Sequence, residues 1–134
     1  MGLSNEVRTD IVKFRLEKAS NTFSEVPVLL EHKFYRTAAS RLYYACYYAA
    51  TALLISDGYE THTHNGVKTL LGLHYIKEGK IEKSLGKMYA QAFNLRQSRD
   101  YEDWIDIEEN DVKSFLQPAE QFIKTIEKLI NQTT

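Results

Sequence analysis

Cysteine is nearly absent from this 134-residue sequence, and Cys46 alone cannot form an internal disulfide or a thiolate zinc site. Only two prolines and six glycines are present, too few for a collagen-like or low-complexity chain. Neither sign of charge dominates, because 17 basic and 18 acidic residues leave a net charge of -1. No overall positive field therefore draws the protein to nucleic acid or anionic lipid. With 43% hydrophobic residues, the composition predicts one folded domain over residues 1–134.

Long hydrophobic runs are missing as well. The longest weakly polar segment, residues 42–55, has 14 residues, whereas a helix needs about 20 to cross a bilayer. The first residues also lack the basic and apolar regions of a secretion signal. We therefore expect a cytoplasmic protein with no membrane partner.

Apolar residues recur every three or four positions along nearly the whole chain, and no window alternates long enough to predict a strand. This pattern predicts an all-α protein with five helical segments in an antiparallel bundle. The first helix is expected to begin at Ser4, a good N-cap residue, and to end at Pro27. The second and longest is expected from Val28 or Glu31 to Asp57, at the centre of the bundle.

The second half of the chain continues the helical pattern. A polar loop is expected over residues 59–66, followed by a short helix that stops at Gly79. The fourth helix carries apolar residues from 81 to 95 and leads into a charged segment. The fifth follows an acidic start at residues 108–111, and Pro118 is expected to kink it or to restrict its regular part to residues 118 onward.

The central helix carries a tyrosine-rich run that needs covering on several sides. Four tyrosines occupy much of its circumference, which predicts contact with other helices or with a second copy in a homodimer (Tyr43, Tyr44, Tyr47 and Tyr48). Arg41, Tyr44 and Tyr48 are spaced i, i+3 and i+7, so they share one helical face. Buried hydroxyl and guanidinium groups need hydrogen-bond partners, which either a structural network or a bound ligand can supply.

The end of the fourth helix carries the second polar group. Arg96 and Asp100 are spaced to form an ion pair, while Arg99 lies on a neighbouring face and can reach a phosphate or a partner's carboxylate. Tyr101 adds a ring on which a base can stack. Two interpretations remain open for this segment: solvated salt bridging, and binding of an anion or nucleotide.

Histidine and cysteine give little sign of a metal or nucleophile site. His62 and His64 are two residues apart, a spacing that points them to different sides of a helix, and no compact carboxylate set completes the site. We expect one to cap a helix from the loop and the other to pack at the helix start. Cys46 is interpreted as a small core residue. Neither a metal nor a cofactor is expected.

Four segments in this order resemble the HEPN domain, a helical module of prokaryotic toxin–antitoxin and nucleotidyltransferase-linked systems, and its small stand-alone branch in particular. The resemblance spans roughly residues 5–130 and rests on Ala38–Ala50, on Leu53-Leu54 with Gly58, on His64-Asn65-Gly66-Val67, and on Leu95–Tyr101. It implies an up-and-down bundle of four to five helices that is usually dimeric. The resemblance further implies that active members cleave RNA at the dimer interface with an Arg and a His that are separated by four to six intervening residues.

This sequence departs from that pattern, because no histidine follows an arginine at the required spacing. After Arg96 the matching positions hold Tyr101, Glu102 and Asp103. A tyrosine, with a pKa of ~10, is a poorer proton carrier at neutral pH than histidine. The first hypothesis is therefore a weakly catalytic or non-catalytic homodimeric partner of a nucleotidyltransferase-like protein. The alternatives are a metal-independent ribonuclease, with candidate residues Arg96, Tyr101 and Glu102, and a nucleotide- or anion-binding protein.

Overall fold

The computed structural model describes residues 4–101 and 106–132, with the side chains of residues 97–101 left outside that description. Every regular element in these two ranges is helical, as the sequence predicted. The elements are α1 (Asn5–Glu31), α2 (Tyr35–Ser56), α3 (His64–Leu71), a π-helical turn (Gly72–Ile76), α4 (Lys83–Tyr101) and α5 (Glu109–Gln132).

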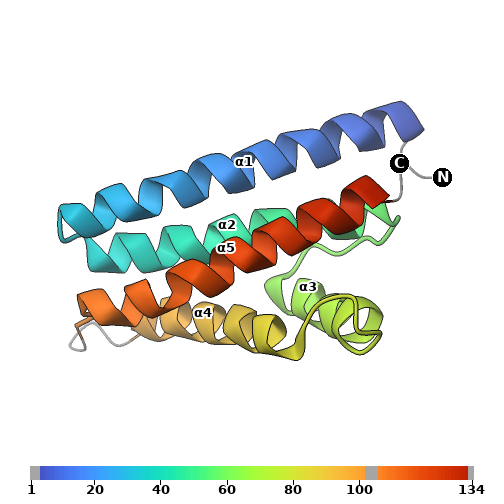
Figure 1. The fold of residues 1–134 in the computed structure, drawn as a ribbon. Helices are drawn as coiled ribbons and strands as arrows, with labels where there is room; N and C mark the ends of the chain where they lie inside the picture. The colour runs from blue at the N-terminus through green and yellow to red at the C-terminus, as the bar shows by residue number, and fades with distance from the viewer. Residues whose placement is uncertain (1–3, 102–105, 133–134) are drawn as a thin grey trace.

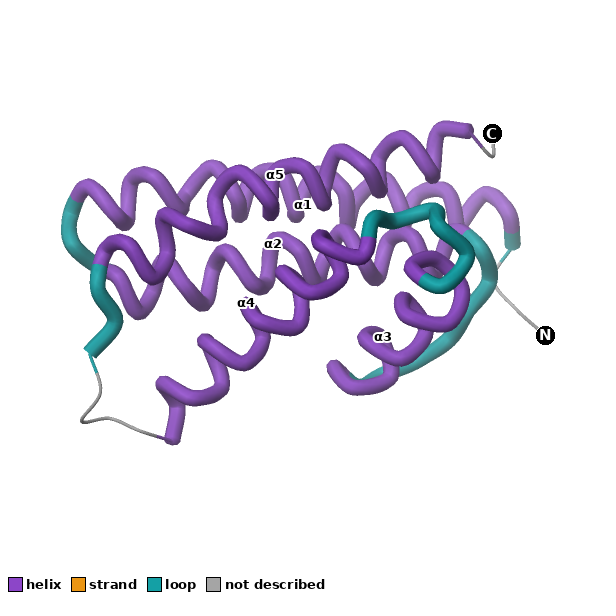
Figure 2. The backbone as a smooth tube through the Cα atoms, turned by 60° about the horizontal axis from the view of Figure 1, so that its bottom comes forward, coloured by secondary structure: helices purple, strands orange, loops and turns teal. Residues whose placement is uncertain are grey.

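Four long helices form an up-and-down bundle, with each one antiparallel to the next along the chain (Figure 1). The start of α1 and the end of α5 lie at the same end of the bundle. The short α3 lies at this end too, beside the first turns of α4, and a loop links the two (Figure 2). The bundle thus brings the middle of α2, the start of α3 and the middle of α4 to one side of the molecule.

The first two helices confirm the predicted caps but not the predicted boundary between them. The Ser4 hydroxyl accepts a hydrogen bond from the Val7 N–H, and α2 ends at Ser56 before Gly58, which adopts a φ of 85°. The prediction that Pro27 ends α1 was wrong, because the helix continues to Glu31. Proline removes a single N–H donor, and the apolar residues around it, Val26 and Leu30, are buried against the core. The second helix accordingly begins later than expected.

The region around the third helix differs from the prediction in two ways. The loop ends at Thr63, so that His64, expected in the loop, is the first residue of α3. The helix then changes to π-helical turns from Gly72 to Ile76, which the apolar spacing did not predict. This turn packs on α4 at Gly86, where an added Cβ would overlap the Ile76 side chain.

The last helix begins where its acidic residues predicted. The Asp111 carboxylate accepts a hydrogen bond from the Glu108 N–H at 2.8 Å, and both Glu109 and Asp111 lie in the first turn. The alternative prediction that the regular helix is restricted to residues 118 onward was wrong, because α5 runs through Pro118. Val112 and Ala119 are buried on either side of the proline, so core packing holds both halves of the helix.

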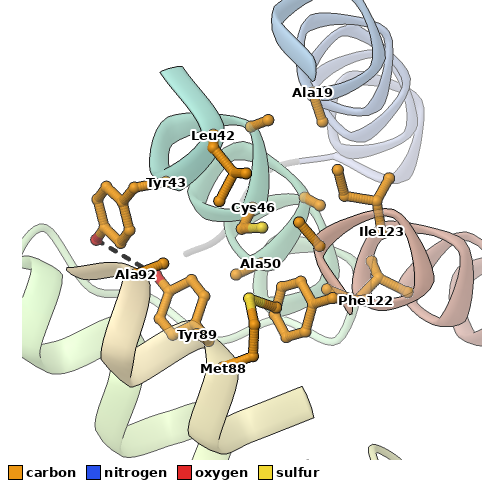
Figure 3. Close-up of a cluster of buried hydrophobic side chains, with 14 of the residues drawn as sticks. Ala19, Leu42, Tyr43, Cys46, Ala50, Met88, Tyr89, Ala92, Phe122 and Ile123 are labelled. Carbon is orange, nitrogen blue, oxygen red and sulfur yellow. Dashed lines mark hydrogen bonds between the residues drawn. The ribbon is translucent and has the colours of Figure 1, made fainter. Parts of the chain in front are cut away.

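The core is built around α2, which is buried along most of its length, as predicted. Figure 3 shows Cys46 and Ala50 of α2 among side chains of α1, α4 and α5. Cys46 is fully buried, and this burial raises the pKa of its thiol, as expected for a core residue. No helix in the described ranges is long and apolar enough to span a membrane.

Candidate functional site

Side chains from three elements form an aromatic cluster on the side of the bundle where α2, α3 and α4 meet. Its members are Tyr43, Tyr44 and Tyr47 of α2, His64 of α3, and Tyr89 and Phe93 of α4. Helical spacing explains the grouping, because residues 89, 93 and 96 are i, i+4 and i+7 on one face of α4. Arg96 extends that face and lies at the edge of the cluster.

His64 packs against aromatic rings of α2 and α4. Its ring centroid lies 4.5 Å from that of Tyr47 and 5.9 Å from that of Phe93, on which it stacks. Its Nδ1 atom is hydrogen-bonded to the Tyr43 hydroxyl at 2.7 Å. Tyr43 is fully buried, so this bond ties the imidazole of the short helix to the bundle core.

The Tyr43 hydroxyl also lies 3.5 Å from the hydroxyl of Tyr89, as the dashed line in Figure 3 shows. Burial raises the pKa of Tyr43 to about 12 and raises that of Tyr89 well above its ordinary value, so both phenols keep their protons at neutral pH. Two proton arrangements are compatible with the hydrogen bonds that link Tyr89, Tyr43 and His64. In one, Tyr89 donates to Tyr43 and Tyr43 donates to His64, which leaves an N–H on Nε2. In the other, His64 donates from Nδ1 and Nε2 is the basic nitrogen.

Arg96 is the cation of the site. Its guanidinium carbon lies 5.0 Å from the Tyr44 ring centroid, within the range of a cation–π contact. Burial lowers the pKa of His64, and the positive charge of Arg96 lowers it further. The imidazole is therefore neutral at pH 7, with the guanidinium as its charged neighbour. Together they offer N–H donors, a ring nitrogen and aromatic faces.

The loop before α3 places His64 in the cluster. Thr63 is the N-cap of α3 and its hydroxyl accepts a hydrogen bond from the Gly66 N–H at 2.9 Å. Glycine fits closely at position 66, because an added Cβ would overlap Thr61 Oγ1 and lie only 2.9 Å from Thr63 Oγ1. The close approach of the threonine loop to Gly66 fixes the first turn of the helix, and with it His64.

The structure separates some of the predicted site residues and joins others. Tyr44 and Tyr48 lie on one face of α2 with ring centroids 6.0 Å apart, and Tyr44 contacts Arg96. Arg41 points elsewhere and pairs with Glu25 of α1 at 3.4 Å, with both side chains about half exposed. The Tyr44–Arg96 contact therefore joins one residue of each predicted group, whereas Arg41 pairs with α1 instead. The side chains of Arg99, Asp100 and Tyr101 lie outside the described residues, and so does Glu102.

His64 is the site residue that the sequence analysis missed. One of His62 and His64 was expected to pack at a helix start, and His64 lies there, but neither histidine was linked to Arg96. The signal was the segment His64-Asn65-Gly66-Val67, and the fold was needed to place it beside α4. Within the described ranges, no three His, Cys, Asp or Glu side chains are grouped to hold a metal ion.

Comparison with known proteins places this bundle in a family. A model of the HEPN domain matches residues 12–129. The chain belongs to the HEPN family. A "UPF0332 protein" of Thermotoga maritima is 34% identical over 120 residues, covering 90% of this chain and 91% of its own. Two Methanocaldococcus jannaschii proteins, each named "putative toxin", are 33% and 28% identical; they cover 97% and 86% of this chain, and 96% and 78% of their own lengths.

The HEPN match covers every element of the candidate site. It begins within α1, includes all of α2, α3 and α4, and ends near the last turn of α5. The resemblance drawn from the four sequence segments is thus confirmed. Within the matched region, the positive charge of Arg96 acts on His64 of α3, a residue that lies 32 positions earlier in the sequence.

Proposed function

We propose that this HEPN domain binds the phosphate of RNA or of a nucleotide at Arg96, as a module of a toxin–antitoxin pair. The observation that carries the proposal is the grouping of the Arg96 guanidinium with the neutral imidazole of His64 and the Tyr44 ring. Guanidinium groups form strong charge-assisted hydrogen bonds to phosphate oxygens. The Nε2–H of His64, in the first of the two proton arrangements, adds a further donor.

The toxin–antitoxin context is supported by the two relatives named "putative toxin", one of which aligns over nearly its whole length. The family resemblance adds a nucleotidyltransferase-like protein as the partner of the HEPN module. Co-purification of the two proteins tests this part separately: a stable complex that survives gel filtration is expected. Failure of the partner to co-elute at micromolar concentration would contradict it.

Titrations with a short RNA and with mononucleotides, each at two salt concentrations, test phosphate binding. Arg96→Ala should weaken binding about 10- to 100-fold, the equivalent of ~1.5–3 kcal/mol for a charge-assisted hydrogen bond. Arg41→Ala is the matched control, because it removes the same charge from a half-exposed pair with Glu25. Equal losses in the two variants would indicate only general charge attraction and would refute the site.

A ribonuclease is the second candidate function, and the observation that favours it is His64. In the second proton arrangement the Nε2 atom of this neutral imidazole can accept the proton of an RNA 2′-hydroxyl. Arg96 would then stabilise the charge that develops on the phosphate. On this hypothesis His64 would supply the imidazole that the Arg96 segment lacks.

The two functions are separated by His64→Gln, because glutamine retains a hydrogen-bonding side chain but neither takes up nor releases a proton near neutral pH. Cleavage of the same RNA is followed in the presence of a metal chelator. A ribonuclease predicts loss of cleavage in both His64→Gln and Arg96→Ala, with binding retained in the first. A binding module predicts no cleavage by the wild type. Cleavage that survives both changes would exclude this site as its source.

The proposed homodimer would form through the α1–α2 face. Phe14 of α1 is 62% exposed, and Lys18 lies between this ring and the half-buried Tyr48 of α2. Aromatic side chains are enriched at protein interfaces. The patch adjoins Tyr44, so that a second copy seated on it would bring two Arg96 sites into one neighbourhood.

A further inference from the structure

We infer that the cavity between α1, the last turns of α2 and the loop that follows them binds a free amino acid with an aromatic side chain. The cavity has a volume of about 460 Å³, which is within the range of small-molecule pockets, about 300–1,000 Å³. An arginine, a glutamate and two tyrosines are among the residues that line it (Arg15, Glu60, Tyr47 and Tyr59). Such a ligand carries no phosphate, so this site is proposed independently of the Arg96 site.

The end of α2 forms one wall of the cavity. The helix closes with a Schellman motif, in which Gly58 has a φ of 85° and its N–H donates to the Ile55 carbonyl at 3.0 Å. The N–H of Tyr59 donates to the Leu54 carbonyl at 2.9 Å, so the chain turns back and both residues line the cavity. The Tyr59 ring also stacks on His74, with ring centroids 4.5 Å apart and an interplanar angle of 17°. This wall is therefore formed before a ligand arrives, which lowers the cost of binding.

Two residues of opposite charge line the cavity without pairing with each other. Arg15 of α1 donates to the hydroxyl of the buried Thr51 at 3.3 Å, and this bond holds its guanidinium against α2. Glu60 comes from the loop and is exposed. No ion pair joins Arg15 to Glu60 in the part of the chain that the structure describes. A ligand with both a carboxylate and an ammonium group would give each of them a charged partner.

The combination of charges and rings selects among the classes of ligand. A simple anion would be attracted by Arg15 but repelled by Glu60, and for a simple cation the two effects are reversed. A free amino acid carries both charges on one carbon atom, from which its side chain leaves in another direction. Tyr47 and Tyr59 offer that side chain aromatic surfaces, on which a ring packs in a stacked or edge-to-face arrangement. An aromatic amino acid therefore matches the charged and the apolar parts of the cavity.

Titration of the wild type with phenylalanine and three analogues tests each part of the site, with the amide NMR signals of Tyr59 and Glu60 as the readout. Hydrocinnamate lacks the ammonium group, phenethylamine lacks the carboxylate, and glycine lacks the ring. Phenylalanine should shift both signals. Hydrocinnamate and phenethylamine should each bind at least about tenfold more weakly, through loss of a charge-assisted hydrogen bond. Glycine should also bind at least about tenfold more weakly, because it buries no ring.

Two charge variants test which residue binds which end of the ligand. Arg15→Gln should weaken binding of phenylalanine about tenfold, but it should not weaken binding of phenethylamine, which has no carboxylate. Glu60→Gln should likewise weaken phenylalanine about tenfold and should not weaken hydrocinnamate, which has no ammonium group. Arg41→Gln is the matched control, because it removes the same charge from a half-exposed pair with Glu25. Its binding of phenylalanine should change less than about twofold.

The inference is overturned if phenylalanine shifts neither signal at millimolar concentration. Equal binding of phenylalanine, hydrocinnamate and phenethylamine to the wild type would overturn it too, because only the ring would then be recognised. An equal loss of phenylalanine binding in Arg15→Gln and Arg41→Gln would contradict the role of Arg15. RNA binding by Arg96→Ala tests the phosphate site alone, so the two proposals can fail separately.

Discussion

Substitution of Gly66 by alanine tests how the candidate site is held in place. An added Cβ at this position would overlap Thr61 Oγ1, and it would lie 3.1 Å from Thr61 Cβ and 2.9 Å from Thr63 Oγ1. Rotation of Thr63 cannot relieve the contact without loss of the N-cap bond to the Gly66 N–H. The methyl group therefore has to displace the Thr61 side chain and, because Thr61 Cβ and Thr63 Oγ1 are also close, to shift the cap or the first turn of α3, where His64 lies.

The magnitude follows from three contributions. Overpacking costs about 1–3 kcal/mol and a lost N-cap bond costs about 1 kcal/mol, whereas the better helix propensity of alanine returns up to about 1 kcal/mol. We expect Gly66→Ala to lower the free energy of unfolding by ~1–3 kcal/mol. Gly72→Ala is the matched control, because Gly72 has helical φ and ψ of -61° and -48° and nothing lies within 4 Å of its added Cβ. It should raise stability by up to ~1 kcal/mol.

Urea unfolding followed by far-UV circular dichroism measures both variants against the wild type. The two substitutions are chemically identical and six residues apart, yet we expect them to change the free energy of unfolding in opposite directions. The imidazole NMR signals of His64 should also shift in Gly66→Ala, because its environment of tyrosine rings changes. Gly66→Ala as stable as Gly72→Ala would refute the steric account of this turn.

Three further predictions concern the cluster and the α1–α2 face. Tyr43→Phe leaves the buried Tyr89 hydroxyl without its bond to Tyr43, so urea unfolding should show a loss of ~1–3 kcal/mol; a loss no larger than in the half-buried Tyr35→Phe would contradict this. Arg96→Ala should raise the pKa of His64 in an NMR titration, since the guanidinium charge helps to lower it. Because the pKa of His64 is lower in the folded chain than in the unfolded chain, the unfolded chain binds more protons at acidic pH. The free energy of unfolding of the wild type should therefore fall as the pH drops below about 6.5, and that of Arg96→Ala should fall less. Sedimentation should give about twice 15.5 kDa for the wild type and a monomer for Phe14→Asp; a monomeric wild type would exclude the dimer.

The helical fold was predictable because each long helix buries a regular stripe of apolar residues. The cap at Ser4 and the stop at Gly58 follow from local chemistry, and both were confirmed. Helix ends that depend on tertiary packing were not predictable. Pro27 and Pro118 normally weaken helices, yet each lies among residues that are buried against neighbouring helices, and this packing outweighs the lost hydrogen bond.

The candidate site was predictable only in part, for a related reason. Spacing along one helix grouped Tyr44 with Tyr48, and the charged segment at the end of the fourth helix singled out Arg96. The contact between Tyr44 and Arg96, and the position of His64 beside both, depend on how three separate segments pack. Spacing also placed Arg41 on the tyrosine face, but its ion pair with Glu25 comes from a different helix, α1. Periodicity describes one helix at a time and carries no information on such pairings.

The shortest α-helix holds the imidazole, and this limits how long the site stays assembled. Only Val67 and Leu71 are buried in α3, whereas α2 is buried along most of its length. Local unfolding of α3 therefore requires less free energy than unfolding of the bundle. Amide hydrogens of residues 64–71 should exchange with solvent faster than those of α2. Each such opening would withdraw His64 from Arg96 and leave the four long helices intact, so we expect the aromatic cluster to lose and regain its imidazole while the bundle stays folded.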